Sequence, residues 1–116
     1  MRIQVPARRL TVHLSDTDLW HHKPLYHEIV RRAHHAGLIG ATVIRGMEGF
    51  GSSGHIHTTR ILSLADNLPI MVIIIDTEPK IRAFLSHLDD ITTECLVTIE
   101  SLDTIRYIAD QERQVG

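Results

Sequence analysis

The stretch LPIMVIIIDTEPKIRAFLSHL, residues 68–88, decides the fold class because it joins a buried strand to an amphipathic helix. Its apolar run IMVIII, at 70–75, is typical of a strand that is buried on both faces. Thr77 stands where a helix N-cap is expected, and Glu78 and Pro79 suit the first helical turn. The core stripe of this helix is predicted at Ile81, Phe84, Leu85 and Leu88.

The segments before this stretch also predict a strand, a helix and a strand. Residues 9–14 alternate polar and apolar side chains, which indicates a half-buried strand. Pro24 suits the first turn of a helix, and Gly37 is expected to end that helix in the left-handed conformation. Glu28 and Arg32 are expected to pair on its outer side. The β-branched run GATVIR, residues 40–45, predicts the second strand.

Residues 96–101 predict a further strand and residues 104–108 a short terminal one, whereas residues 110–116 are polar and expected to fray. The order β-α-β-β-α-β, with right-handed crossovers, places both helices on one face of an antiparallel four-stranded sheet. We therefore predict an α+β, ferredoxin-like fold in a single domain, 1–116, with an ordered core of about residues 8–108. The second sheet face is left uncovered, and we expect another subunit to cover it.

Composition excludes several classes of protein. The 116 residues carry 12 Lys plus Arg and 14 Asp plus Glu, a formal net charge of −2, which argues against a nucleic-acid binder. The single cysteine, Cys95, predicts a reducing, cytoplasmic environment. The N-terminus, MRIQVPARRL, lacks the apolar region of a signal peptide, and no apolar run approaches the ~20 residues that span a bilayer.

The Gly-rich segment RGMEGFGSSGHIHTTR, residues 45–60, is longer than a hairpin between two antiparallel strands requires. Its glycines allow positive φ and close approach of backbone N–H groups to a ligand, and arginines at both ends can hold an anion. The same composition is typical of a solvated connection, so the residues alone leave both interpretations open. No Walker pattern is present.

The side chains that carry chemistry elsewhere give weaker signals. His55 and His57 face the same way on an extended segment and can occupy two positions on a zinc ion, but surface histidine is the commoner role. Trp20 can stack on a base or simply pack, and packing is more common. Cys95 is interpreted as a small core residue rather than a nucleophile.

Four motifs carry a resemblance to a known family. They are WHHKPLY at 20–26, GLIGATVIRGMEGFG at 37–51, IHT at 56–58 and LPIMVIIIDTEPKI at 68–81. Over about residues 8–108 the chain resembles the PII-like signalling proteins of the domain-of-unknown-function 190 family. The resemblance implies a homotrimer of ferredoxin-like subunits whose sheets face inward.

The resemblance also implies a function. PII proteins bind an adenine nucleotide (AMP, ADP or ATP) between subunits, near the base of the long loop after the second strand, and regulate a partner that is often a membrane transporter. We therefore expect a sensor rather than an enzyme, with no required cofactor, no metal and no nucleic-acid partner. The ligand-binding residues that the resemblance implies are Lys23, Arg45, Gly46, Glu48, Gly49, Phe50, Gly51, His57 and Arg60.

Two departures from PII proteins bear on phosphate binding. Their Gly- and Lys-rich phosphate loop, between the second helix and the next strand, is replaced here by DDITTE at 89–94. Their basic C-terminal segment is reduced to Arg106 and Arg113. Phosphate contacts must then come from Lys23, Arg45 and Arg60.

Two other functions compete with the sensor. A divalent-metal-binding trimer of the cation-tolerance type shares the architecture and would use the histidines. An acylphosphatase-like hydrolase would need an anion loop between the first strand and first helix, where SDTDLWHHK, residues 15–23, is acidic and lacks glycine.

Overall fold

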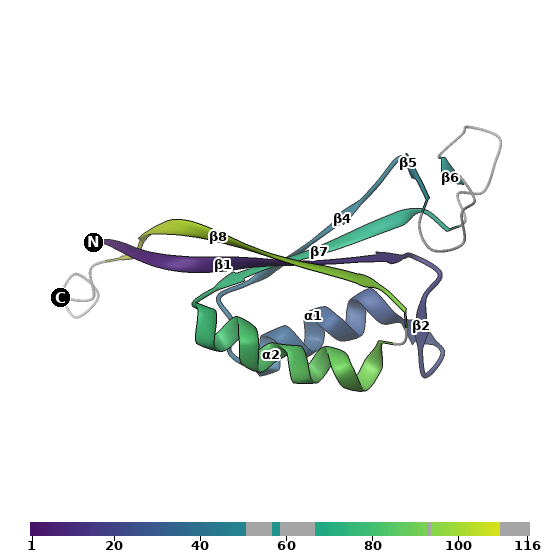
Figure 1. Cartoon of the computed structure of the whole chain (residues 1–116), viewed down its shortest axis with the longest axis horizontal. Helices are drawn as coiled ribbons and strands as arrows, with labels where there is room; N and C mark the ends of the chain where they lie inside the picture. Colours follow the sequence, from purple (N-terminus) through teal and green to yellow (C-terminus); the bar gives the residue numbers. More distant parts are fainter. Residues whose placement is uncertain (51–56, 59–66, 93, 110–116) are drawn as a thin grey trace.

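The computed structural model describes residues 1–50, 57–58, 67–92 and 94–109 of the chain. These residues form a sheet and a layer of two helices (Figure 1). In chain order the elements are β1 (Arg2–Ser15), β2 (Leu19–Trp20), β3 (Lys23–Pro24), α1 (Leu25–His35), β4 (Ala41–Arg45), β5 (Glu48–Gly49), β6 (His57–Thr58), β7 (Pro69–Asp76), α2 (Glu78–Ile91) and β8 (Leu96–Tyr107).

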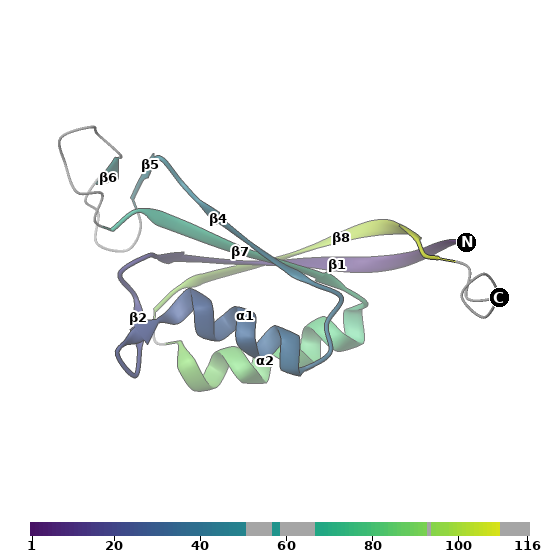
Figure 2. The same ribbon diagram turned by 180° about the vertical axis from the view of Figure 1, so that it is seen from behind.

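The main sheet has the strand order β4-β7-β1-β8, and each neighbouring pair is antiparallel. Both helices cover the same face of this sheet, as the two opposite views show (Figures 1 and 2). The predicted ferredoxin-like α+β fold is therefore confirmed. Two small antiparallel ribbons, β2–β3 and β5–β6, add to it and were not predicted.

The core lies between the sheet and the helices. Along β7 every second side chain, Ile70, Val72 and Ile74, points to the helices and is almost completely buried. Leu10 lies opposite Ile74 and Val12 opposite Val72, so β1 supplies the same core layer. The predicted stripe of α2 is confirmed, with Ile81, Phe84 and Leu88 buried and Leu85 partly buried.

The other face of the sheet has no layer on it within the described part of the chain (Figure 2). Met71, Ile73 and Ile75 of β7 point to this open face and are half-buried. One row across the sheet brings Ile44, Met71, His13 and Leu96 side by side. The expectation that both faces of this strand are buried thus holds for only one face within a single chain.

The outer strands differ from the prediction in length. β1 begins at Arg2 rather than near residue 9, and β8 is one continuous strand rather than two short ones. They pair without interruption from Arg2 opposite Tyr107 to His13 opposite Leu96, and Met1 and Ile108 exchange backbone hydrogen bonds of 2.9 Å beyond them. Pro6 is tolerated because β7 pairs with β1 only from Arg8 onward, so its missing N–H faces no strand.

Both predicted helix boundaries are close to those observed. Gly37 ends α1 with φ of +75°, as expected. Thr77 occupies the N-cap position of α2 but makes no capping hydrogen bond through its side chain. Just before the helix, the buried carboxylate of Asp76 accepts from the backbone N–H groups of Thr77 at 2.6 Å and Ile39 at 3.0 Å. No described helix has the length and apolar character needed to cross a bilayer.

Candidate functional site

An open cavity of about 1200 Å³ lies at the end of the sheet where β1 ends and β7 begins. Four segments of the chain line it, between residues 13–25, 44–50, 67–71 and 90–96. They are the β1–α1 connection, the base of the long loop, the start of β7, and the connection from α2 to β8. The cavity therefore brings together two regions that are distant in the sequence, the base of the long loop and the acidic segment after α2.

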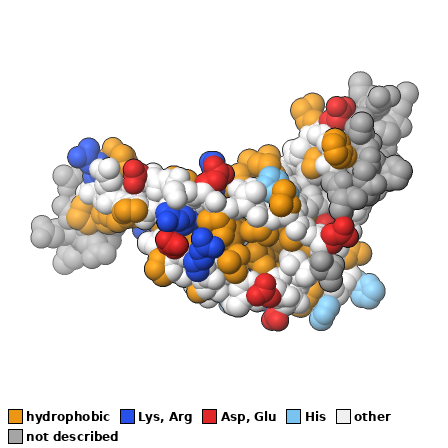
Figure 3. Space-filling view, in the orientation of Figure 1, with side chains coloured by type: hydrophobic (Ala, Val, Ile, Leu, Met, Phe, Trp, Pro, Cys, Tyr) orange, Lys and Arg blue, Asp and Glu red, His pale blue; other side chains and the backbone are white. Residues whose placement is uncertain are grey.

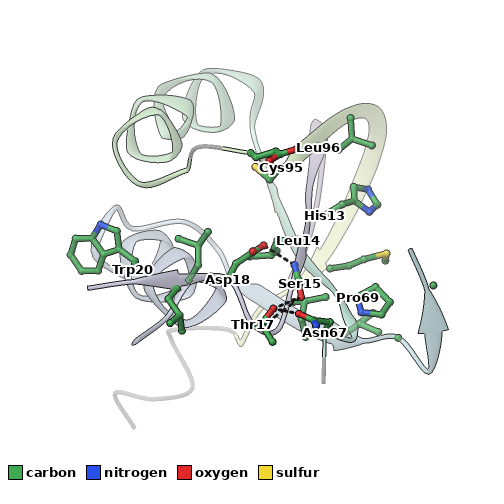
Figure 4. A pocket seen from close by; sticks show the side chains of 18 of the residues that line it. His13, Leu14, Ser15, Thr17, Asp18, Trp20, Asn67, Pro69, Cys95 and Leu96 are labelled. Carbon is green, nitrogen blue, oxygen red and sulfur yellow. Dashed lines mark hydrogen bonds between the residues drawn. The ribbon is translucent and has the colours of Figure 1, made fainter. Parts of the chain in front are cut away.

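Hydrogen bonds organise the wall formed by the end of β1. The Ser15 N–H donates to the Asp18 carboxylate at 2.9 Å, which holds the chain as it turns away from the sheet. The Ser15 hydroxyl lies 3.0 Å from that of Thr17, and the Thr17 hydroxyl donates to the side-chain oxygen of Asn67, two residues before β7. Figure 4 shows this network on one side of the cavity, with Cys95 and Leu96 away from it. The β1 end is thus joined to β7 by side chains as well as by the sheet.

The structure brings four of the nine predicted ligand-binding residues to this cavity: Gly46, Glu48, Gly49 and Phe50. Arg45 does not line the cavity, although its neighbours in the chain, Ile44 and Gly46, do. Lys23 is exposed on the β2–β3 ribbon and does not line the cavity. Gly51 and Arg60 lie outside the described residues, and of His57 only the backbone is described, paired with Gly49 in the β5–β6 ribbon.

The glycines at the loop base have a different role from the one expected. Positive φ occurs at Gly37 but at neither Gly46 nor Gly49. The Gly46 N–H donates to the Pro69 carbonyl at 2.7 Å and so is already engaged. A Cβ on Gly46 would lie 2.6 Å from Pro69 Cγ, and one on Gly49 would lie 3.1 Å from the same atom. Glycine is needed here because the loop base packs against Pro69.

Arg45 is held by an ion pair. Its Nη1 lies 3.4 Å from Asp16 Oδ2, and the Asp16 side chain is only 10% exposed. The other carboxylate oxygen, Asp16 Oδ1, is buried and has no hydrogen-bond partner within the described ranges. Half of the Arg45 side chain is exposed, so the guanidinium is accessible from solvent while it neutralises Asp16.

The lining is acidic. Among the described lining residues there are four carboxylates, no lysine and no arginine. The acidic side chains are Asp18, Glu48, Asp90 and Glu94. An anionic ligand therefore needs cationic charge from outside this lining, such as that of the half-exposed Arg45, or from another molecule.

Trp20 and Cys95, two further lining residues, are packed rather than free. The Trp20 ring is stacked on the His21 ring with centroids 4.0 Å apart, and the Arg32 guanidinium carbon lies 5.3 Å from the Trp20 ring centre. Cys95 is half-buried against the core, and burial raises the pKa of its thiol. Both observations agree with the packing roles predicted for these residues.

The metal-binding alternative has little support among the described residues. They contain no group of three His, Cys, Asp or Glu side chains arranged to hold a metal ion. His55 and the side chain of His57, which carry the metal hypothesis, lie outside what the structure describes.

Comparisons with known proteins agree with the fold. Residues 7–104 match the family model DUF190, described as "Uncharacterized ACR, COG1993". A "UPF0166 protein" of Aquifex aeolicus (strain VF5) is 34% identical over 105 residues, covering 90% of this chain and 98% of the relative. "UPF0166 protein MJ1524" of Methanocaldococcus jannaschii is 29% identical over 87 residues, 75% of this chain and 80% of the relative.

A solved structure shares the architecture. CPII, a nitrogen regulatory PII-like protein from Thiomonas intermedia K12 bound to ADP, AMP and bicarbonate, superposes with a TM-score of 0.62. The sequences are 17% identical, and the match covers 88% of this chain and 98% of CPII. The fold is therefore that of the PII-like proteins, and the chain belongs to the DUF190 family.

Proposed function

We propose that the protein is a PII-like sensor, not an enzyme, that forms a homotrimer, binds an adenine nucleotide in the clefts between subunits and regulates a partner protein. The observation that carries this proposal is the position of the cavity. It lies at the base of the long loop, and Gly46, Glu48, Gly49 and Phe50 line it.

The open sheet face supports the assembly. Ile44, Met71 and Leu96 belong to one row across that face, and the same three side chains line the cavity. Ile44 is 45% exposed and Leu96 is 62% exposed, which is unfavourable for a row of large apolar side chains in water. A second copy that covers this row would also close one side of the cavity. Assembly and ligand binding would then involve the same residues.

The nucleotide is supported by chemistry and by comparison. CPII, which has the same fold, is bound to ADP and AMP. In this chain Arg45 is the described cation closest to the loop base, and its charge-assisted hydrogen bonds suit a phosphate oxygen. Because Arg45 is paired with Asp16, a phosphate would share or take over that contact. Arg45 would thereby link occupancy of the cavity to the start of the loop that follows it.

The proposed lack of catalysis follows from the resemblance to PII-like signalling proteins. It agrees with the packed position of Cys95, where burial raises the pKa of the thiol and disfavours the reactive thiolate. Loop ordering rather than bond cleavage would then be the output, read by a partner protein.

Isothermal titration calorimetry with AMP, ADP and ATP tests the ligand, and sedimentation velocity at the same protein concentration tests the assembly. We expect micromolar or tighter affinity for at least one nucleotide and a trimer. Failure of all three nucleotides to bind below millimolar concentration overturns the sensor, and a stable monomer overturns the subunit cleft.

A further inference from the structure

The β2–β3 ribbon forms a short hairpin, and its tip is strained. Trp20 pairs with Lys23, and the two turn residues between them, His21 and His22, have φ of 49° and 67°. Such a turn favours Asn and Gly, so two histidines must be held in it by contacts elsewhere. Figure 3 shows histidine side chains projecting at the end of the molecule that carries the hairpin. We call this segment, residues 19–24, the tryptophan hairpin.

Arg32 of α1 supplies such a contact. Its guanidinium lies over the Trp20 ring at 5.3 Å from the ring centre, a cation–π arrangement. The Arg32 side chain is 17% exposed, so this contact is largely removed from solvent. The hairpin wall of the cavity, which includes Trp20, therefore rests on an arginine from the helix layer.

The same guanidinium reaches the end of α2. Arg32 Nη1 donates to the His87 carbonyl at 3.4 Å and lies 3.7 Å from Asp90 Oδ2. The last turn of α2 has no basic residue of its own, so Arg32 supplies the positive charge that a helix C-terminus favours. Asp90 and the residues that follow it, 91 and 94–96, form the opposite wall of the cavity.

A buried carboxylate fixes the guanidinium between these walls. Glu28 was expected to pair with Arg32 on the outside of the helix, but the Glu28 side chain is only 7% exposed. Its Oε2 accepts from Arg32 Nε at 2.8 Å, and its two oxygens accept from Arg31 at 2.8 and 2.7 Å. The correction has a simple cause: residue 28 lies on the edge of α1 that faces the rest of the protein, beside buried Ile29.

We propose that Arg32 is a positioning residue of the cavity, which holds the tryptophan hairpin and the end of α2 at a fixed separation and so sets the affinity for the ligand. The effect of Arg32 on ligand affinity rests on the proposed nucleotide function. Its effect on the separation between the tryptophan hairpin and the end of α2 does not. One side chain contacts Trp20 on one wall and Asp90 on the other, and it also donates to the His87 carbonyl nearby in α2, while Glu28 holds it in place.

The chain carries a natural reporter on each wall, because it has one tryptophan and one cysteine. Trp20 fluorescence and its quenching by acrylamide report on the hairpin. The rate at which Cys95 reacts with 5,5′-dithiobis(2-nitrobenzoic acid) reports on the connection after α2. Both are measured on the full chain without ligand, and ADP affinity is then measured by calorimetry.

Arg32→Met is the test variant and Arg31→Met is the matched control. Arg31 shares Glu28 with Arg32 and makes no hydrogen bond or ion pair with either wall among the described residues. For Arg32→Met we expect the reaction of Cys95 to be about fivefold faster or more, Trp20 to be more accessible to acrylamide, and ADP affinity to fall about tenfold. For Arg31→Met all three values should stay within about twofold of wild type.

The outcomes separate the two parts of the inference. If Trp20 quenching and Cys95 reactivity in Arg32→Met are the same as in wild type, the positioning role is overturned. If Arg31→Met changes both measurements as much as Arg32→Met does, the role is not specific to Arg32. Altered reporters with unchanged ADP affinity overturn the link to the ligand. Wild type that binds none of AMP, ADP and ATP refutes the proposed nucleotide function and with it that link, while the reporters still decide the positioning role. If Arg32→Met does not fold, Arg32→Lys keeps the charge and loses the planar fork, and both reporters should shift in the same directions by a smaller amount.

Discussion

Replacing Gly46 by alanine should separate β4 from β7 at the base of the cavity. The new Cβ would lie 2.6 Å from Pro69 Cγ, whereas ordinary contact begins at 3.4 Å. The proline ring cannot rotate away, and Gly46 is fixed to Pro69 by the 2.7 Å backbone hydrogen bond. Relieving the overlap must shift backbone, so we expect a loss of about 1–3 kcal/mol in the free energy of unfolding. ADP affinity should fall as well, because both residues line the cavity.

Urea denaturation at one fixed protein concentration measures the loss, with Gly40→Ala as the control. A Cβ on Gly40 meets nothing within 4 Å, so its cost should stay below about 0.5 kcal/mol. The cause is tested by a double-mutant cycle with Pro69→Ala, which removes the Cγ atom. We expect Gly46→Ala to cost less in the Pro69→Ala background by about 1 kcal/mol or more. An equal cost in both backgrounds would refute the steric reasoning.

Four other changes have definite expected outcomes. Ile73→Asp places a charge on the open sheet face and should dissociate the assembly in sedimentation velocity, while circular dichroism shows the helices retained. Arg45→Ala should weaken ADP binding about ten- to a hundredfold in calorimetry, because Arg45 is half exposed and adjoins the lining residue Gly46 in the chain. Lys23→Ala, on the exposed β2–β3 ribbon, should change it less than about twofold. Glu94→Gln removes one lining carboxylate and should strengthen nucleotide binding about two- to fivefold at low salt. The increase in affinity should be larger for ATP than for AMP, because ATP carries more negative charge. It should disappear at high salt, where charges are screened. Hydrogen bonds from Arg31 first, and then from Arg32, lower the pKa of Glu28 from 4.5 to about 2. Glu28→Gln should therefore be less stable than wild type above pH 4.5. The difference in stability should shrink as the pH falls toward 2, which acid-denaturation curves of both proteins measure.

The order of the elements and both helix boundaries follow from local signals. The period of α2, the proline before α1 and Gly37 after it are all visible within a few residues of the boundary that they mark. The full lengths of β1 and β8 differ from the prediction for two different reasons. In residues 2–8 the apolar Ile3, Val5 and Ala7 do alternate with exposed residues, so this start of β1 carries a local strand signal that the prediction left out. Residues 102–107 show no clear alternation and are a strand because they pair with the start of β1.

The candidate site was predicted in part for the same reason. The glycine-rich segment indicated the loop base, and Gly46, Glu48, Gly49 and Phe50 do line the cavity. The opposite wall, from Asp90 to Leu96, is brought there by tertiary packing, and the sequence marked it only as a departure from PII proteins. The contact between Gly46 and Pro69 joins residues 23 positions apart, so no local pattern reports it.

The strand order has a consequence for the chain as it is made. β1 is synthesised first, yet it lies between β7 and β8, which come last. Until β7 has left the ribosome, β1 has no native partner, and its second edge stays open until β8 is complete. Folding must therefore wait for nearly the whole chain, and such long separations slow it. A chain that stops before β8 leaves one edge of β1 without its partner strand, so we expect premature termination to yield an aggregation-prone species rather than a smaller folded one.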